Sequence, residues 1–174
     1  MWVFGYGSLI WNPGFPHAEQ VIGTLPGYAR SFCMRSIHHR GTEADPGLVL
    51  ALDETQDAAC EGVAFRVAPG CETDTLVMLR ERELISSAYV EKTLNIDLRD
   101  GRSVSAVTYV IDPDHVQYCG GLPLEEQAHI IAHATGGRGP NSEYLDNTAQ
   151  HLRTLGLQDA ELDWLSARVA KISA

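Results

Sequence analysis

Residues 89–111 read YVEKTLNIDLRDGRSVSAVTYVI, and this stretch sets the class of fold. The segments 89–98 and 104–111 are rich in β-branched and aromatic residues, which favour strands. Asp100-Gly101 stands between them, and this dipeptide favours the tight turn of a β-hairpin. The stretch therefore predicts two antiparallel neighbours in a sheet.

Further strands are predicted on the N-terminal side of this hairpin. Apolar runs at 2–4, 48–52 and 62–67 are bounded by glycine or proline, as is typical of buried strands. Segment 21–32 is predicted as a pair of strands interrupted at Pro26-Gly27, a turn dipeptide.

Helices are predicted around the same hairpin. One covers 73–85, with Thr73 as its N-cap. Three follow the hairpin, over 123–135 with Pro123 as a first helical residue, over 142–155 with Asn141 as its cap, and over 159–172. Strands around one helix and then a run of helices predict an α+β fold with a largely antiparallel sheet. Closure into a barrel is compatible with this order, but the pattern alone does not show it.

Length and composition restrict the class of protein. The 174 residues suit a single domain over 1–174. The net charge of −10 argues against nucleic acid or an anionic membrane as a partner. The four cysteines form no C-x-x-C pair and are interpreted as reduced thiols. Without a signal peptide or a run of ~20 apolar residues, the protein is expected in the cytoplasm. Its oligomeric state is left open.

Gly5-Tyr6-Gly7-Ser8-Leu9 is the first candidate site and directly follows a predicted strand. Two glycines let the chain turn sharply and let a ligand approach the backbone closely. Successive N–H groups in such a turn can bind an anion, and the Ser8 hydroxyl adds a donor. On spacing alone, a plain tight turn is the more common explanation. The stretch is not a Rossmann fingerprint, because it lacks a third glycine and a following helix, and it is not a G-x-S-x-G elbow.

Glu83 is the candidate general base. It stands near the end of the predicted helix and four residues after Leu79, so its carboxylate is expected on or beside the apolar face. Burial there would raise its pKa into a range useful for proton transfer. The alternative, which spacing alone favours, is a surface ion pair with Arg80 or Arg82.

A local concentration of basic residues is the third candidate, formed by Arg30, Arg35, His38, His39 and Arg40. It suits either a substrate carboxylate or simple balance of nearby acidic residues. The glycine-rich segment 136–145 leads into a helix and suits either an anion site or a flexible connection. Tyr144 is either a core residue or a hydroxyl directed at a ligand.

His129 and His133 lie four residues apart on a predicted helix. This is half of a zinc site, but no third ligand is evident from the spacing. No metal is therefore expected.

Taken in order along the chain, four of these blocks resemble the ChaC family of γ-glutamylcyclotransferases. The resemblance covers residues 2–155 and is carried by Val3-Phe4-Gly5-Tyr6-Gly7-Ser8-Leu9-Ile10-Trp11, His39-Arg40-Gly41-Thr42 with Pro46-Gly47, Arg82-Glu83-Leu84, and Asn141 with Glu143-Tyr144-Leu145. The first and third blocks are the most specific. After the third, many members have glycines where this chain has Ser86-Ser87-Ala88-Tyr89.

The resemblance implies a mixed β-barrel with flanking helices and the conversion of glutathione to 5-oxoproline and cysteinylglycine. It implies that Glu83 serves as base and then acid, and that no cofactor is needed. It places substrate contacts at Phe4, Gly5, Tyr6, Gly7, Ser8, Leu9, Arg40 and Tyr144. The alternatives are a cyclotransferase for other γ-glutamyl amino acids or amines, a metabolite-binding regulator linked to cation transport, and a serine hydrolase that uses Ser8.

Overall fold

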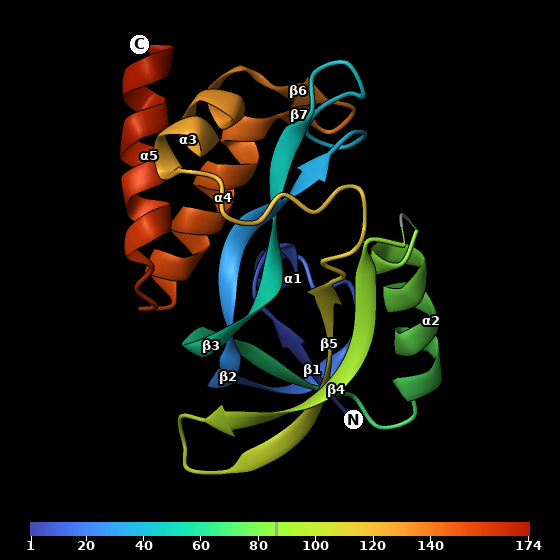
Figure 1. Ribbon diagram of the computed structural model, residues 1–174. Helices are drawn as coiled ribbons and strands as arrows, with labels where there is room; N and C mark the ends of the chain where they lie inside the picture. The colour runs from blue at the N-terminus through green and yellow to red at the C-terminus, as the bar shows by residue number, and fades with distance from the viewer. Residues whose placement is uncertain (86) are drawn as a thin grey trace. The chain divides into compact units, whose positions relative to one another are not determined.

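The structure is a computed structural model that describes residues 1–85 and 87–174 (Figure 1). Ser86, one of the small residues after the Arg82-Glu83-Leu84 block, lies outside the described residues. Contacts between Cα atoms divide the chain into two compact units. Unit 1 comprises Met1–Arg30 and Ala51–Val116, and unit 2 comprises Ser31–Leu50 and Gln117–Ala174. A single domain over 1–174 stays a prediction.

Five strands close into a barrel in the order β1-β3-β2-β4-β5. They are β1 Trp2–Gly5, β2 His17–Ser36, β3 Gly47–Val67, β4 Tyr89–Leu98 and β5 Ser103–Ile111. β1 pairs antiparallel with β3 and parallel with β5, whereas β4 pairs antiparallel with both β2 and β5. The prediction of an α+β fold with a mixed, largely antiparallel barrel is confirmed.

The β4–β5 hairpin forms where the sequence predicts it. Its register runs from Tyr89 opposite Ile111 to Asp97 opposite Ser103. Gly101 in the turn has a φ of 95°, in the left-handed region that favours glycine. The Asp100 carboxylate accepts a hydrogen bond from the Arg102 N–H and closes the turn.

Two strand predictions are wrong, and both are wrong in the same way. Segment 21–32 is not a broken pair, because β2 continues through Pro26-Gly27 with Gly27 at a φ of 83°. The runs 48–52 and 62–67 belong to the single 21-residue strand β3. The residues between them are mostly exposed and largely polar, so they look like a loop in the sequence, yet they lie within β3, with Asp57 at a φ of 65°.

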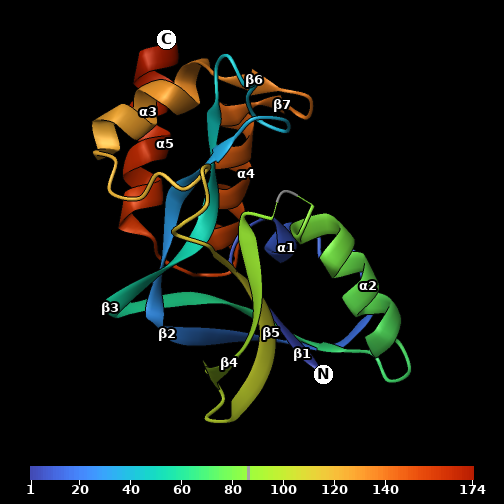
Figure 2. The same cartoon turned by 45° about the vertical axis from the view of Figure 1, so that its right-hand side comes forward.

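Two helices belong to unit 1, the single turn α1 Ser8–Trp11 and the longer α2 Glu72–Glu83. α2 lies beside β4 (Figures 1 and 2). It begins one residue before the predicted cap, so Thr73 is inside the helix and Cys71 takes the cap position without a side-chain hydrogen bond. Thr75 and Leu79 form its buried face.

The core of unit 1 fills the barrel with apolar side chains from every strand and from the turn after β1. Its buried members are Phe4, Tyr6, Leu25, Tyr28, Leu52, Cys60, Ala64, Ile96, Leu98, Ala106 and Val110. Burying this much apolar surface is the main stabilising contribution available to a chain without disulfides.

Unit 2 contains three helices that pack against one another, α3 Leu124–His133, α4 Asn141–Thr154 and α5 Ala160–Ser173 (Figure 2). Pro123 is the cap of α3 and not its first residue, and α4 begins at Asn141 after Pro140. The glycine-rich segment begins as a small hairpin, β6 Thr135–Gly136 with β7 Gly139–Pro140, and then enters α4. No helix in the described part of the chain is long and apolar enough to span a membrane.

Asn141 does not cap its helix as predicted, because its side chain is committed elsewhere. It is fully buried, and its Oδ1 accepts a hydrogen bond from the Leu48 N–H at 2.8 Å. Its Nδ2 donates to the Leu48 carbonyl, also at 2.8 Å. The amide therefore takes the place of a neighbouring strand along this part of β3 and satisfies two buried backbone groups.

Three glycines in unit 2, Gly41, Gly47 and Gly136, bring backbone segments into direct contact. A Cβ on Gly41 would lie 2.0 Å from the Gly47 nitrogen, and one on Gly47 would lie 2.3 Å from the Arg40 carbonyl oxygen. A Cβ on Gly136 would lie 2.4 Å from the Gly41 nitrogen. These are backbone atoms that no side-chain movement can clear, so each position requires glycine.

We expect Gly41→Ala to destabilise the protein by at least ~1–3 kcal/mol, the usual cost of overpacking a filled site. The chemical-denaturation midpoint measures this. Gly70→Asn is the matched control, because Gly70 has open space around its α-carbon and asparagine tolerates its φ of 86°. A Gly41→Ala variant as stable as Gly70→Asn would show that the backbone contact is not required.

Candidate functional site

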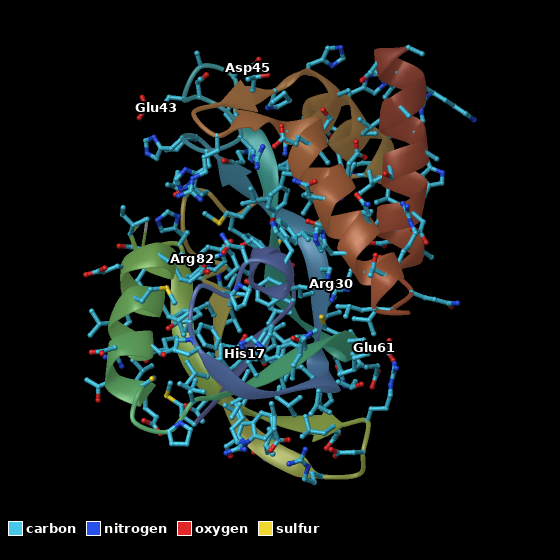
Figure 3. All side chains as sticks on the ribbon, turned by 180° about the vertical axis from the view of Figure 1, so that it is seen from behind. His17, Arg30, Glu43, Asp45, Glu61 and Arg82 are labelled. Carbon is cyan, nitrogen blue, oxygen red and sulfur yellow. The ribbon has the colours of Figure 1, made fainter. Side chains whose placement is uncertain are left out.

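The turn after β1 is held in place by contacts on both sides. The Tyr6 hydroxyl donates to the Tyr109 carbonyl on β5 at 2.9 Å. Arg30 on β2 donates through Nε to the Tyr6 carbonyl at 2.7 Å and also bonds the Glu61 carbonyl on β3. Figure 3 labels Arg30 and Glu61. Three strands therefore fix the conformation of this turn.

There is little room for a side chain at Gly5, whereas the close approach of a ligand to this turn stays a prediction. A Cβ on Gly5 would lie 2.9 Å from Leu9 Cβ, and one on Gly62 of β3 would lie 2.4 Å from the Gly5 carbonyl oxygen. The chain then enters α1 at Ser8, so the expectation that no helix follows the turn is wrong. The Ile10 N–H is bonded to the Gly7 carbonyl at 2.9 Å.

Ser8 and Glu83 both lie against the side chain of Arg82. Figure 3 shows Arg82, which reaches from the end of α2 to α1. Arg82 Nη2 donates to Ser8 Oγ at 3.0 Å, and Nη1 donates to the Asn12 carbonyl at 2.6 Å. Arg82 Nε lies 3.6 Å from Glu83 Oε1.

Glu83 is the last residue of α2, and its side chain is only 15% exposed. Burial raises the pKa of the Glu83 carboxyl, and the nearby Arg82 cation opposes that rise. The prediction of a partly buried Glu83 with a raised pKa is confirmed. The ion pair with Arg82 that the alternative required is present too, but it is not at the surface, and Arg80 pairs with Glu91 instead.

Tyr109 is a neighbour of Glu83 that the sequence did not reveal. It is buried, and its hydroxyl donates to Glu91 Oε1 at 2.9 Å. Arg80 holds the same Glu91 carboxylate through two hydrogen bonds of 3.0 Å. Burial, the bond to Glu91 and the charge of Glu83 all raise the pKa of Tyr109, so the phenol stays protonated. A tyrosine in an apolar strand gives no local signal of such a contact.

Two of the predicted substrate contacts, Arg40 and Tyr144, belong to unit 2. The Arg40 guanidinium lies 5.7 Å from the Tyr144 ring centre and 3.7 Å from the Glu143 carboxylate. It also donates to the Pro140 carbonyl at 3.1 Å. The Tyr144 hydroxyl accepts a hydrogen bond from the Leu50 N–H at 3.2 Å. Both residues thus stabilise unit 2, and their role as substrate contacts stays a prediction.

The basic cluster is divided between the units. Arg30 belongs to unit 1, whereas Arg35, His38, His39 and Arg40 belong to unit 2. Burial and the nearby Arg138, His38 and Arg40 lower the pKa of His39. Among the other predicted contacts, Phe4 and Leu9 have buried side chains.

His129 and His133 are held by contacts within α3. His129 lies 3.2 Å from Glu125, and His133 Nδ1 donates to the His129 carbonyl at 2.7 Å. Within residues 1–85 and 87–174, no three side chains of His, Cys, Asp or Glu gather closely enough to hold a metal ion. Cys33 and Cys60 are buried thiols, and Cys71 and Cys119 are partly buried.

Unit 1 therefore presents the Glu83 carboxylate, whose pKa is raised, and the Ser8 hydroxyl, which follows the glycine turn, both in contact with the Arg82 guanidinium. A carboxylate of raised pKa can take up and release a proton at a higher pH than an ordinary glutamate. Donation from this turn and from the Ser8 hydroxyl to an anion or a developing oxyanion stays a prediction. This combination suits a reaction that needs proton transfer on an anionic substrate.

Comparison with known proteins connects this arrangement to one family. The sequence pattern of the family described as ChaC-like protein matches residues 1–172. The glutathione-specific γ-glutamylcyclotransferase of Escherichia coli is 40% identical over the whole chain and 74% of that relative. The γ-glutamylcyclotransferase 2-3 of Arabidopsis thaliana is 35% identical over 99% of this chain and 89% of its own length. The crystal structure of a glutathione-specific γ-glutamyl cyclotransferase from yeast matches with a TM-score of 0.87 and 24% sequence identity. The match covers all of this chain and 99% of the yeast chain, so the two proteins share a fold.

We expect Glu83→Gln to stabilise the protein at pH 7 more than at pH 4. The folded state raises the pKa of Glu83, so it binds this proton more tightly than the unfolded state. Stability is therefore lost as the pH rises from the ordinary glutamate pKa of about 4.3 through the raised value. Glutamine cannot ionise, so the variant does not lose stability in this way as the pH rises. Urea unfolding at both pH values measures it, with the exposed Glu81→Gln as control. A stability difference from wild type that is equal at the two pH values would contradict the raised pKa.

Proposed function

The chain belongs to the ChaC-like protein family, and from this membership we propose that it is a γ-glutamylcyclotransferase that acts on glutathione. Curated relatives that match the chain over nearly its whole length support the reaction. The observation in the structure that carries the proposal is the Glu83 carboxylate, which is buried beside the turn that carries Ser8.

The reaction needs no nucleophile from the protein. The α-amine of the γ-glutamyl group attacks its own γ-carbonyl and closes a five-membered ring. The amide bond to the cysteine nitrogen then breaks, which gives 5-oxoproline and cysteinylglycine. Holding the flexible γ-glutamyl chain in a folded shape brings the amine and carbonyl together, and this positioning lowers the barrier.

Glu83 carries the protons in this scheme. Its carboxylate removes a proton from the attacking amine, and the resulting acid delivers it to the leaving nitrogen. One group can do both steps because its raised pKa lies closer to the pH at which it works. The reaction is balanced without a metal or an organic cofactor.

The turn at Phe4–Leu9 binds the substrate in this proposal. Backbone N–H groups at Tyr6, Gly7, Ser8 and Leu9, with the Ser8 hydroxyl, hold the α-carboxylate and the oxyanion. Phe4 and Gly5 support the turn from the barrel core. Arg40 and Tyr144 are proposed as further substrate contacts on the strength of the family resemblance alone.

Use of Ser8 as a hydrolase nucleophile is disfavoured by its neighbour. Ser8 Oγ accepts a hydrogen bond from Arg82, a cation that has no lone pair with which to remove the serine proton. That neither nucleic acid nor a membrane is a partner is proposed from the acidic composition. A cytoplasmic location stays a prediction.

The leaving group is tested by comparing substrates. Glutathione and γ-glutamyl-alanine are assayed at equal concentrations, with 5-oxoproline as the measured product. Preference for glutathione supports the proposal. Equal turnover of both substrates would show that the protein is a γ-glutamylcyclotransferase of broader specificity. Tight binding without product would show that it is a metabolite-binding regulator.

We expect Glu83→Gln to lower the rate of 5-oxoproline formation by roughly 10²–10⁴, the usual contribution of a general base. Glutamine keeps the size of the side chain but cannot accept the proton, so substrate should still bind. Glu81→Gln should be nearly silent, because it points about 160° away on the same helix. Rate and affinity are measured for both variants. An active Glu83→Gln enzyme, or equal losses in the two, would remove Glu83 from this role.

We expect Gly7→Val to abolish activity, because its side chain would fill the space in which a ligand approaches the turn. Ser8→Ala should have a smaller effect, since the backbone donors remain. Circular dichroism establishes that each variant folds, and glutathione turnover then gives the comparison. Full activity in a folded Gly7→Val variant would show that the turn does not bind substrate.

A further inference from the structure

We propose that Arg82 is a positioning residue, which directs the Ser8 hydroxyl toward the substrate as a donor and holds it beside the carboxylate of Glu83. The inference rests on the proposed function of the site. It assigns a task to a side chain whose three contacts join segments far apart in the sequence, since Ser8 and Arg82 are separated by 74 positions.

The first step concerns the proton of Ser8. A hydroxyl has one hydrogen to donate and two lone pairs to accept with, whereas a guanidinium only donates. Because Arg82 Nη2 donates to Ser8 Oγ at 3.0 Å, the serine hydrogen must point to a different acceptor. A substrate carboxylate is such an acceptor, and donation to an anion is stronger than donation to a neutral group.

The second step concerns the rigidity of the arrangement. Arg82 Nη1 donates to the Asn12 carbonyl, the residue directly after α1, at 2.6 Å. With Nη2 on Ser8, one planar group thus holds both ends of the α1 turn. A lysine in this position would keep the charge, but its single nitrogen does not reproduce the fixed fork of a guanidinium.

The third step concerns Glu83. The Arg82 cation lies 3.6 Å from this carboxylate and favours its ionised form, in opposition to burial. Tyr109, whose pKa the charge of Glu83 helps to raise, donates its hydroxyl proton to Glu91, and the Glu91 charge is paired with Arg80. Arg82 is therefore a cation positioned to keep Glu83 available as a base while it orients the donor.

The test compares two variants. Arg82→Met removes both the positive charge and the paired N–H donors of the guanidinium, whereas Arg82→Lys keeps the charge and removes only the paired donors. For Arg82→Met we expect KM for glutathione to rise about 10- to 100-fold, the range expected when a hydrogen bond network with a charged partner is lost. The acidic limb of its kcat/KM profile should move to higher pH. For Arg82→Lys we expect KM for glutathione to rise as in Arg82→Met, whereas the pH profile of kcat/KM should stay close to that of wild type.

Two further measurements separate positioning from folding. Arg153→Met removes one arginine from an exposed ion pair with Asp163 and should leave KM and the pH profile unchanged. Adding Ser8→Ala to Arg82→Met should cost much less than Ser8→Ala costs in the wild-type protein, because the hydroxyl is no longer directed. Full additivity of the two losses, or a normal KM and pH profile in a folded Arg82→Met enzyme, would overturn the proposal.

A readout without turnover keeps this test distinct from that of the proposed function. Carboxyl ¹³C NMR follows the titration of Glu83 directly, and its midpoint should rise in Arg82→Met and stay near the wild-type value in Arg82→Lys. If wild type forms no 5-oxoproline from any γ-glutamyl substrate, the proposed function fails while this titration still tests the contact with Glu83. An unchanged midpoint in Arg82→Met would contradict the third step.

Discussion

The barrel depends on the position of its shortest strand. β1 has only four residues, yet it pairs antiparallel with β3 on one side and parallel with β5 on the other, and so closes the sheet. Because both of its edges are occupied, the chain that leaves it at Gly5 has little freedom in direction. The turn at Tyr6–Ser8 is therefore fixed by the closure of the barrel, and Arg30 and Tyr109 secure it from neighbouring strands.

Much of the fold could be predicted from local patterns. The β4–β5 hairpin was readable because Asp100-Gly101 marks the turn and alternation marks the strands. β2 and β3 were not readable as single strands, because Pro26-Gly27 and the polar stretch after Leu52 have the composition of turns. Pairing with neighbouring strands overrode those local preferences, and pairing between distant segments leaves no local trace.

The candidate site was predictable only in part, for a related reason. The burial of Glu83 could be predicted, because it follows from helical spacing after Leu79. The arrangement around it could not, since Ser8 on α1 and Tyr109 on β5 are remote from it in the sequence. They are connected to α2 through the hydrogen bonds of Arg82 and through Glu91, which pairs with Arg80. Arg40 is the opposite case, because the sequence singled it out and the structure shows it in contacts within the protein. Its guanidinium lies over the Tyr144 ring and donates to the Pro140 carbonyl.

The three interlocked glycines of unit 2 also restrict how sequences of this kind can diverge. Gly41, Gly47 and Gly136 each exclude a side chain because a backbone atom of another segment occupies the space. A change at one of them cannot be compensated by a smaller neighbouring side chain alone, since a backbone atom would remain in the way. Divergence at these positions would require two backbone segments to be rebuilt together, so a single substitution at any one of them should be selected against.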